Sequence, residues 1–256
     1  MKEFIKFVED NFPKESLSKS FNIDYIRLNY FLNYLENKKV KDILEIGPGF
    51  GFLASYLAYK GYNVVVIEHP DTYINTDKNS LKELARKFQF EIIFHDIELD
   101  DISFSKSFDL CYSLAVIEYL HHSPKKMLSI IDSSLKDKGL IYLDTPNALN
   151  LRKRLYMFLG IYPYVPIDYL YNNEINRSHI REYSKKDLYY ILDEYGFKQI
   201  SIKYENCMNK TIRLKNDNYV RYSSWMDFFS LYGIYTIFTL IKNSLKDTLI
   251  ATAIKN

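Results

Sequence analysis

Short apolar runs alternate with longer helical stretches along most of the chain beyond residue 40. This alternation predicts a parallel sheet whose strands are connected by crossover helices. The runs are almost unbroken by polar residues, which is typical of strands buried on both faces. We expect strands at residues 42–46, 63–67, 91–94, 108–113 and 140–144, followed by strands at 197–204 and 247–254.

Helical patterns flank these strands. Apolar residues recur at helical spacing within residues 21–36 and predict an N-terminal helix that packs on the sheet. Ser184 and Asp187 are spaced as in a capping box, and Gly196 supplies a C-terminal stop, so we expect a helix between them. The triplet Asp-Lys-Gly at residues 137–139 is expected to form a turn before the fifth strand.

The length of 256 residues fits one α/β domain with insertions. We divide the chain into N-terminal helices at 1–39, a core at 40–147, and two segments at 148–182 and 206–245 that interrupt the strand and helix rhythm. Insertions near the carboxyl ends of sheet strands commonly build substrate pockets. We therefore assign both segments to the substrate side of a single domain.

Composition narrows the possible partners. The formal net charge is +2, so the sequence lacks the strong positive field that draws nucleic acids, and we expect a small-molecule acceptor instead. Cys111 and Cys207 form neither a disulfide framework nor a metal-ligand pattern, so no metal is expected. Residues 1–10 mix charged and apolar side chains, unlike a secretion signal. These features predict a cytoplasmic protein.

A glycine-rich turn follows the first strand. Gly47, Gly49 and Gly51 lie between a strand and a helix, where the absence of Cβ atoms permits a tight turn and close approach of a ligand. Glu68 ends the second strand and is placed to accept the hydroxyls of a ribose. A dinucleotide fingerprint would carry glycine or alanine where this chain has Phe52, so the pattern disfavours NAD.

The segment Ile43-Leu44-Glu45-Ile46-Gly47-Pro48-Gly49-Phe50-Gly51 resembles motif I of the class I S-adenosylmethionine-dependent methyltransferases. Segments 64–68, 94–97, 108–120 and 135–147 resemble later motifs of that family, in the same order. The resemblance implies a Rossmann-like, doubly wound α/β sheet of seven strands in the order 3-2-1-4-5-7-6, with the last strand antiparallel. It also implies S-adenosylmethionine as the cofactor.

The resemblance further implies roles for individual residues. Glu45 and the glycine turn would hold the amino-acid end of the cofactor, and Glu68 would bind its ribose. Asp96 would bind the adenine amino group, with Ile97 beside the ring. Ser113, Leu114 and Ala115, at the end of the fourth strand, would pass under the methionine portion, and Glu118 in the segment after the strand would lie close to the cofactor.

Two histidines are candidate general bases, because methyl transfer to a protonated acceptor requires a proton to leave. His121 follows the fourth strand, and a solvent-exposed position is its competing interpretation. His179 belongs to a His-x-Arg-x-Tyr-Ser stretch that resembles a sub-group of methyltransferases associated with surface polysaccharides, such as capsule and lipopolysaccharide. A structural hydrogen bond is its main alternative role. Asn147, Arg181 and Tyr183 are expected to bind an anionic or hydroxylated acceptor.

Residues 225–243 are mostly apolar and aromatic. A membrane span is disfavoured, because the strand expected at 247–254 would return the chain to the sheet. Three roles stay open for the stretch: packing over the substrate side, a homodimer seam, or an interfacial helix on a membrane surface.

The sequence therefore predicts a methyltransferase that acts on a small metabolite, with oxygen favoured over nitrogen as the acceptor atom. A carbohydrate, nucleotide-linked or phospho-modified intermediate of surface polysaccharide biosynthesis is the first substrate class considered. O-methylation of a quinone precursor or another aromatic compound is the alternative within the same enzyme class. An NAD(P)-dependent oxidoreductase and a catalytically silent cofactor-binding subunit are alternatives from other classes.

Overall fold

A computed structural model describes residues 2–13, 22–71, 78–172, 178–207 and 237–256. Within these residues the strands form one seven-stranded sheet in the order β3-β2-β1-β4-β5-β7-β6, which confirms the expected topology. The strands are β1 (Asp42–Ile46), β2 (Asn63–Glu68), β3 (Glu91–Phe94), β4 (Phe108–Leu114), β5 (Leu135–Pro146), β6 (Lys198–Glu205) and β7 (Thr248–Ile254).

The first five strands pair in parallel, and β7 is antiparallel to both of its neighbours, β5 and β6. The antiparallel insertion of β7 is the arrangement that the methyltransferase resemblance implies. Strand β5 begins earlier than expected, because the Asp-Lys-Gly triplet at 137–139 is part of the strand. Lys138 has a left-handed φ of 60°, and the β4–β5 register shifts between Phe108 and Leu110, so the predicted turn is an irregularity within the ladder.

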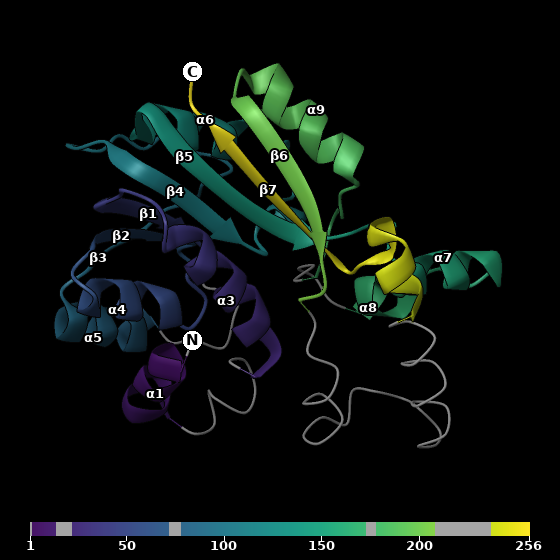
Figure 1. The fold of residues 1–256 in the computed structure, drawn as a ribbon, viewed down its shortest axis with the longest axis horizontal. Coiled ribbons are helices and arrows are strands. Elements are labelled where there is room, and N and C mark those ends of the chain that lie inside the picture. The colour runs from purple at the N-terminus through teal and green to yellow at the C-terminus, as the bar shows by residue number, and fades with distance from the viewer. Residues whose placement is uncertain (1, 14–21, 72–77, 173–177, 208–236) are drawn as a thin grey trace.

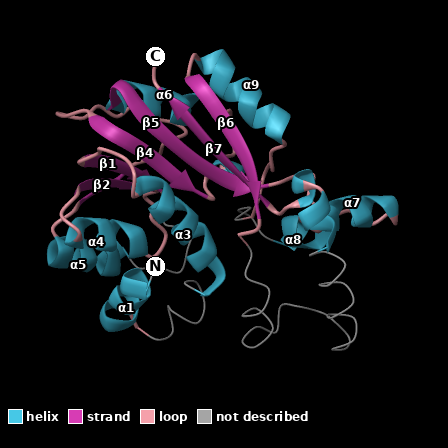
Figure 2. Cartoon of the chain, in the orientation of Figure 1, coloured by secondary structure: helices cyan, strands magenta, loops and turns pink. Residues whose placement is uncertain are grey.

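Helices cover both faces of the sheet (Figures 1 and 2). One face packs against α1 (Lys2–Asn11), α3 (Asn22–Leu35), α4 (Phe52–Tyr59) and α5 (Lys78–Phe88). The opposite face packs against α6 (Lys125–Ser134) and α9 (Lys185–Tyr195). Alternate residues of a strand therefore enter different cores: Ile43 belongs to the first and Leu44 to the second, and both are fully buried.

The expected N-terminal and capped helices are present. Helix α3 buries Leu28, Phe31 and Leu35, and the Phe31 ring lies 4.1 Å from the Tyr112 ring of β4. The side chain of Ser184 accepts the backbone N–H of Asp187, the carboxylate of Asp187 accepts the N–H of Ser184, and Gly196 ends α9 in a left-handed conformation.

The first insertion contains α7 (Leu151–Phe158) and α8 (Ile167–Asn172), which lie beyond the ends of β4 and β5 in Figure 1. Two short 3-10 helices complete the described elements, η2 (Ile117–Tyr119) after β4 and η3 (Asn243–Leu245) before β7. Residues 225–236 of the predicted apolar stretch lie outside the described residues, and 237–241 form a helical segment. No described helix combines the length and apolar character needed to cross a bilayer. The dimer and membrane-surface roles stay predictions.

Candidate active site

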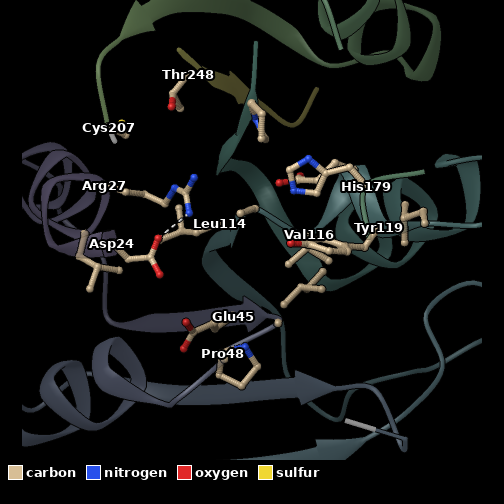
Figure 3. A pocket seen from close by; sticks show the side chains of 18 of the residues that line it. Asp24, Arg27, Glu45, Pro48, Leu114, Val116, Tyr119, His179, Cys207 and Thr248 are labelled. Carbon is tan, nitrogen blue, oxygen red and sulfur yellow. Dashed lines mark hydrogen bonds and ion pairs between the residues drawn. The ribbon is translucent and has the colours of Figure 1, made fainter. Parts of the chain in front are cut away.

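A cavity of about 670 Å³ opens where β1, β2 and β4 end. Its floor is the β1–α4 turn, and its walls come from α3, the segments that follow β2, β3 and β4, the start of α7, and residues 179–182. The carboxyl ends of parallel strands meet at one edge of a sheet, which is where such folds bind ligands. Figure 3 shows Arg27 and Asp24 on one side of this cavity, His179 and Tyr119 on the other, and Glu45 with Pro48 below.

The glycine turn adopts the conformation that its sequence predicts. Gly47, Gly49 and Gly51 have φ values of 74°, 55° and 74°, all in the left-handed region. A Cβ atom on Gly47 would overlap Cγ2 of Val116, so a side chain is excluded there by both conformation and space. Gly47, Pro48 and Gly49 line the cavity, whereas Gly51 precedes the first turn of α4. The turn therefore presents backbone, with little side-chain bulk, to a ligand.

Glu45 is buried beneath this turn, with 3% of its surface exposed. One carboxylate oxygen, Oε2, lacks a hydrogen-bond partner within the described structure. Burial raises the pKa of Glu45 to about 8, and the hydroxyl of Tyr112 offsets only part of that rise. A cationic group entering the cavity would supply the missing partner and restore the carboxylate charge. Glu45 thus fits the ammonium group of an amino-acid ligand.

Glu68 stands at the end of β2 and also lines the cavity. Its Oε1 accepts the backbone N–H of His69 at 2.7 Å, while burial raises its pKa to about 7. Hydroxyl groups that donate to this carboxyl would favour its ionised form. The position and chemistry of Glu68 agree with the ribose role that the resemblance implies.

The two residues expected around adenine are placed differently. Ile97 lines the cavity, but Asp96 does not. Oδ1 of Asp96 accepts the N–H of Glu98 at 2.8 Å, and Oδ2 faces Nε2 of His69 at 3.5 Å. The Asp96 carboxylate therefore stabilises the turn after β3, and its role toward adenine stays a prediction.

Residues after β4 divide in the same way. Leu114, Ala115, Val116 and Glu118 line the cavity, and Ala115 has a left-handed φ of 54°. Ser113 does not line it: the Ser113 hydroxyl donates to the carbonyl of Ile46 at 3.1 Å. Ser113 thus connects the ends of β1 and β4, a structural role where we expected cofactor contact.

A network of buried charge supports the wall above the glycine turn. Glu118 is fully buried, accepts the Thr145 hydroxyl at 2.9 Å, and has a pKa raised by burial to about 7. Asp144 accepts the N–H of Ala115 at 2.9 Å, and its Oδ2 lies 3.0 Å from Nε of Arg27. Burial lowers the pKa of Arg27, but Asp144 and Asp24 outweigh it and leave the pKa above its usual value. The Arg27–Asp144 pair therefore joins α3 to β5.

The structure separates the two histidine candidates. His179 lines the cavity, and its Nδ1 lies 3.0 Å from Oε1 of Glu182. Burial and the nearby charge of Lys153 lower the pKa of His179 to about 4, so its imidazole is neutral at physiological pH. His121 lies outside the cavity lining, with its Nδ1 3.7 Å from Glu98. His121 is exposed after β4, so this conformation does not favour it as the base, and the assignment stays a prediction.

The three residues predicted to bind the acceptor also face elsewhere, and none of them lines the cavity. The Asn147 amide donates to the carbonyls of Ser244 and Lys246, so it fastens the chain before β7 to the end of β5. Arg181 is exposed beside the ring of Tyr183, which is itself buried away from the cavity. Direct acceptor binding by these side chains would require a different arrangement.

Several cavity residues were not anticipated from the sequence, and their functional groups come from three regions. They are Asp24 and Arg27 of α3, Asn150, Arg152 and Lys153 at the start of α7, and Glu182. Asp24 and Arg27 lie on the same face of α3 as the buried Phe31, at positions i, i+3 and i+7, so the helical period alone does not identify them as cavity residues. Asn150 could have been identified from the sequence as a helix N-cap, and its side chain does accept the backbone N–H of Lys153.

The methyltransferase domain family matches residues 21–202 of this chain. The chain belongs to this family. Membership confirms the predicted enzyme class, and the cofactor is S-adenosylmethionine, as the resemblance implied. The family assignment also sets aside the NAD(P)-dependent oxidoreductase.

Curated relatives carry a more specific name. The ubiquinone biosynthesis O-methyltransferase of Rickettsia bellii (strain OSU 85-389) is 27% identical over 143 residues, which cover 54% of this chain and 56% of that protein. The enzyme of the same name from Rickettsia typhi is 26% identical over 215 residues, covering 80% of this chain and 81% of that protein. The match to the Rickettsia bellii protein thus spans little more than half of its length.

Solved structures share the fold of this methyltransferase. An S-adenosylmethionine-dependent methyltransferase from Archaeoglobus fulgidus has a TM-score of 0.54 at 16% identity, with 99% of each chain covered. Phosphoethanolamine N-methyltransferase 2 from Haemonchus contortus, in complex with S-adenosyl-L-methionine, has a TM-score of 0.58 at 16% identity, covering 94% of this chain and 59% of that one. At these identities the similarity concerns the fold alone. The surface-polysaccharide sub-group is not confirmed by these relatives.

Proposed function

We propose that this methyltransferase methylates a hydroxyl oxygen of a small acceptor, with a phenolic hydroxyl of a quinone precursor or related aromatic compound as the first candidate. One observation carries the proposal: His179, a neutral imidazole at physiological pH, lines the same cavity as Glu45 and the glycine turn. In this proposal the cofactor and the proton acceptor share one cavity.

The cavity residues fit S-adenosylmethionine. Glu45 would hold the ammonium group of the cofactor, and Glu68 would bind its ribose. The turn from Gly47 to Gly49 would lie against the part of the cofactor that joins these two groups. When bound, the cofactor supplies a methyl group on a positively charged sulfur, and attack by the acceptor oxygen displaces a neutral thioether. Enclosure and alignment of the reacting atoms supply much of the rate in such a transfer.

His179 would accept the proton that the acceptor loses. The oxygen becomes strongly acidic as the new carbon–oxygen bond forms, so a base of low pKa is sufficient when the proton leaves late in the step. With its Nδ1 hydrogen bonded to Glu182, the imidazole has its lone pair on Nε2. The proton can then pass to solvent after the product leaves.

Two features support an aromatic acceptor. Aromatic and aliphatic side chains of Phe50, Val116, Tyr119 and Leu120 line part of the cavity, as expected of a pocket that binds an apolar ring. Two relatives with similar sequences, from Rickettsia bellii and Rickettsia typhi, are named ubiquinone biosynthesis O-methyltransferases. Tyr119 also lies edge-on to His179, with 4.9 Å between ring centroids, which would place a bound ring close to the base.

A second candidate acceptor is a carbohydrate, nucleotide-linked or phospho-modified intermediate of surface polysaccharide biosynthesis. Asn150, Arg152 and Lys153 bring an amide and two cationic side chains to the cavity wall, groups that bind hydroxyls and phosphates. A third account is a catalytically silent subunit, which would bind cofactor without transferring its methyl group.

An acceptor panel with methyl-labelled S-adenosylmethionine tests the proposal. Catechols, sugar nucleotides and phosphorylated amino alcohols form its three arms, and the products are identified by mass spectrometry. We expect labelled ether from the catechol arm, a loss of at least tenfold in the transfer rate for His179→Asn, and a wild-type rate for His121→Asn. Transfer to nitrogen, or full activity of His179→Asn, contradicts the proposal, and cofactor binding without product in any arm supports the silent subunit.

A further inference from the structure

His179 is one end of a series of contacts that runs through Glu182 to Lys153. Oε1 of Glu182 lies 3.0 Å from Nδ1 of His179, and Oε2 of the same carboxylate contacts Nζ of Lys153. The side chains of Glu182 and Lys153 are 8% and 3% exposed, so both charges are held away from water. A buried pair of this kind is costly to form without mutual compensation. The Glu182–Lys153 pair lies directly beside the proposed base, His179.

Local structure fixes each member of the chain. The backbone N–H of Lys153 donates to Oδ1 of Asn150, which starts α7, and the Lys153 ammonium lies 5.1 Å from the centroid of the Tyr164 ring. The segment that carries His179 is fastened by two hydrogen bonds, from the N–H groups of Ile180 and Arg181 to the carbonyl of Glu118. The beginning and the end of the first insertion therefore meet at Glu182.

The geometry points to Glu182 and Lys153 as positioning residues for His179: Glu182 fixes the tautomer and orientation of the imidazole, and Lys153 keeps Glu182 ionised and the resting imidazole neutral. This inference rests on the proposed function, since it assigns a purpose to the neighbours of the base. Neither residue touches the acceptor in this account.

The negative charge of Glu182 and the positive charge of Lys153 have different effects on His179. A carboxylate on Nδ1 stabilises the imidazolium that forms as the proton arrives, and on its own it would favour protonation of His179 before the reaction. Lys153 and Arg27 oppose that effect from the cavity walls. Arg152, Glu118 and the ring of Tyr119 also line this cavity, and Tyr119 contacts the imidazole edge-on. The base therefore rests neutral and is stabilised when it becomes charged.

The first test is a titration of His179 that needs no acceptor. The five histidines of the chain are observed by NMR in full-length protein, and His179→Asn assigns the relevant signal. Lys153→Met removes the opposing cation and is expected to raise the pKa of His179 by at least about one unit, whereas Glu182→Gln is expected to lower it. Arg154→Met, which removes an exposed cation from the same helix, is the matched control and is expected to leave the titration unchanged.

Lys153→Arg should retain the wild-type titration, because it keeps the charge. Far-UV circular dichroism and S-adenosylhomocysteine affinity verify that each variant is folded. If Lys153→Met and Arg154→Met shift the His179 signal equally, or Glu182→Gln and Lys153→Met shift it in the same direction, the assignment is overturned.

The second test follows methyl transfer to 3,4-dihydroxybenzoate in single-turnover experiments across pH. In Lys153→Met the acid limb of the rate profile should move to higher pH with the NMR titration, and Glu182→Gln should lower the maximal rate about tenfold or more with unchanged cofactor affinity. If His179→Asn transfers methyl slowly but the rate–pH profile of Lys153→Met is the same as that of wild type, this inference is overturned and the proposed function stands. A fully active His179→Asn overturns the base assignment itself, whatever the NMR titration shows.

Discussion

Replacing Glu45 by glutamine tests the proposed contact between this carboxylate and the ammonium group of the cofactor. The carboxyl is 3% exposed and one of its oxygens has no hydrogen-bond partner in the described structure, so a ligand ammonium would be its natural counterion. A hydrogen bond to a charged group contributes about 1.5–3 kcal/mol. Glu45→Gln should therefore weaken S-adenosylhomocysteine binding by roughly 10-fold to 150-fold.

The pH dependence of binding gives a sharper signature than the loss itself. The pKa of Glu45 in the free protein is raised to about 8, so the carboxyl is mostly protonated at pH 6 to 7 and must ionise when the ammonium binds. Because the ionised fraction of Glu45 increases with pH, the affinity for the ligand should rise in this range. Glu45 alone should increase that affinity about ninefold between pH 6 and 7. The ligand stays cationic there, because an α-amino group has an ordinary pKa of about 7.7–8.0.

Isothermal titration calorimetry with S-adenosylhomocysteine at pH 6, 6.5 and 7 measures both effects. Glu68 titrates with a pKa of about 7 and contributes to the slope in wild type and variant alike, so the difference between the two slopes isolates Glu45. Glu83→Gln, an exposed change on α5, is the matched control and should bind as wild type does. If Glu45→Gln keeps the wild-type pH slope, the carboxyl does not meet the ammonium and the reasoning is refuted.

Three further changes probe the turn, the buried ion pair and the helix cap. Gly47→Ala forces a side chain into a left-handed position against Val116 and should reduce cofactor affinity at least tenfold in the same calorimetric assay; unchanged affinity would show that the turn tolerates bulk. Arg27→Met leaves Asp144 buried without its partner and should lower the free energy of unfolding by about 3–5 kcal/mol at pH 7, measured in urea. Because the pKa of Asp144 is already raised to about 6, that loss should shrink as pH falls to 5 and the folded state takes up a proton, and a loss that grows toward pH 5 would contradict the assignment. Ser184→Ala removes a cap and should lower the unfolding free energy by about 1 kcal/mol while cofactor affinity stays constant; weakened cofactor binding would argue against a purely structural cap.

The sheet was predictable because its signals are local and repeat along the chain. Each buried strand is a short apolar run, and the runs at β1, β2 and β4 are read directly from the sequence. The strand order came from the resemblance, since nothing in the local pattern of β7 states that it inserts between β5 and β6. The early start of β5 was missed because Lys138 takes a turn-like φ while the ladder continues.

The part of the cavity that we propose holds the cofactor was also largely predictable, since Glu45, Gly47 and Glu68 belong to short motifs at the ends of consecutive strands. The part that we propose holds the acceptor was not. Asn147 and Lys153 are six positions apart, yet Asn147 holds the chain before β7 and Lys153 meets Glu182 in the cavity wall. Which polar side chain faces the cavity depends on how the first insertion packs against the ends of the strands, and that packing produces no periodic pattern in the sequence.

A crystal structure with S-adenosylhomocysteine tests the central claim most directly. We predict that its ammonium group lies within hydrogen-bonding distance of Glu45, that its ribose hydroxyls contact Glu68, and that its sulfur faces the part of the cavity lined by His179. A ligand bound with its amino-acid end away from Glu45, or with its sulfur enclosed on the side remote from His179, would contradict the account.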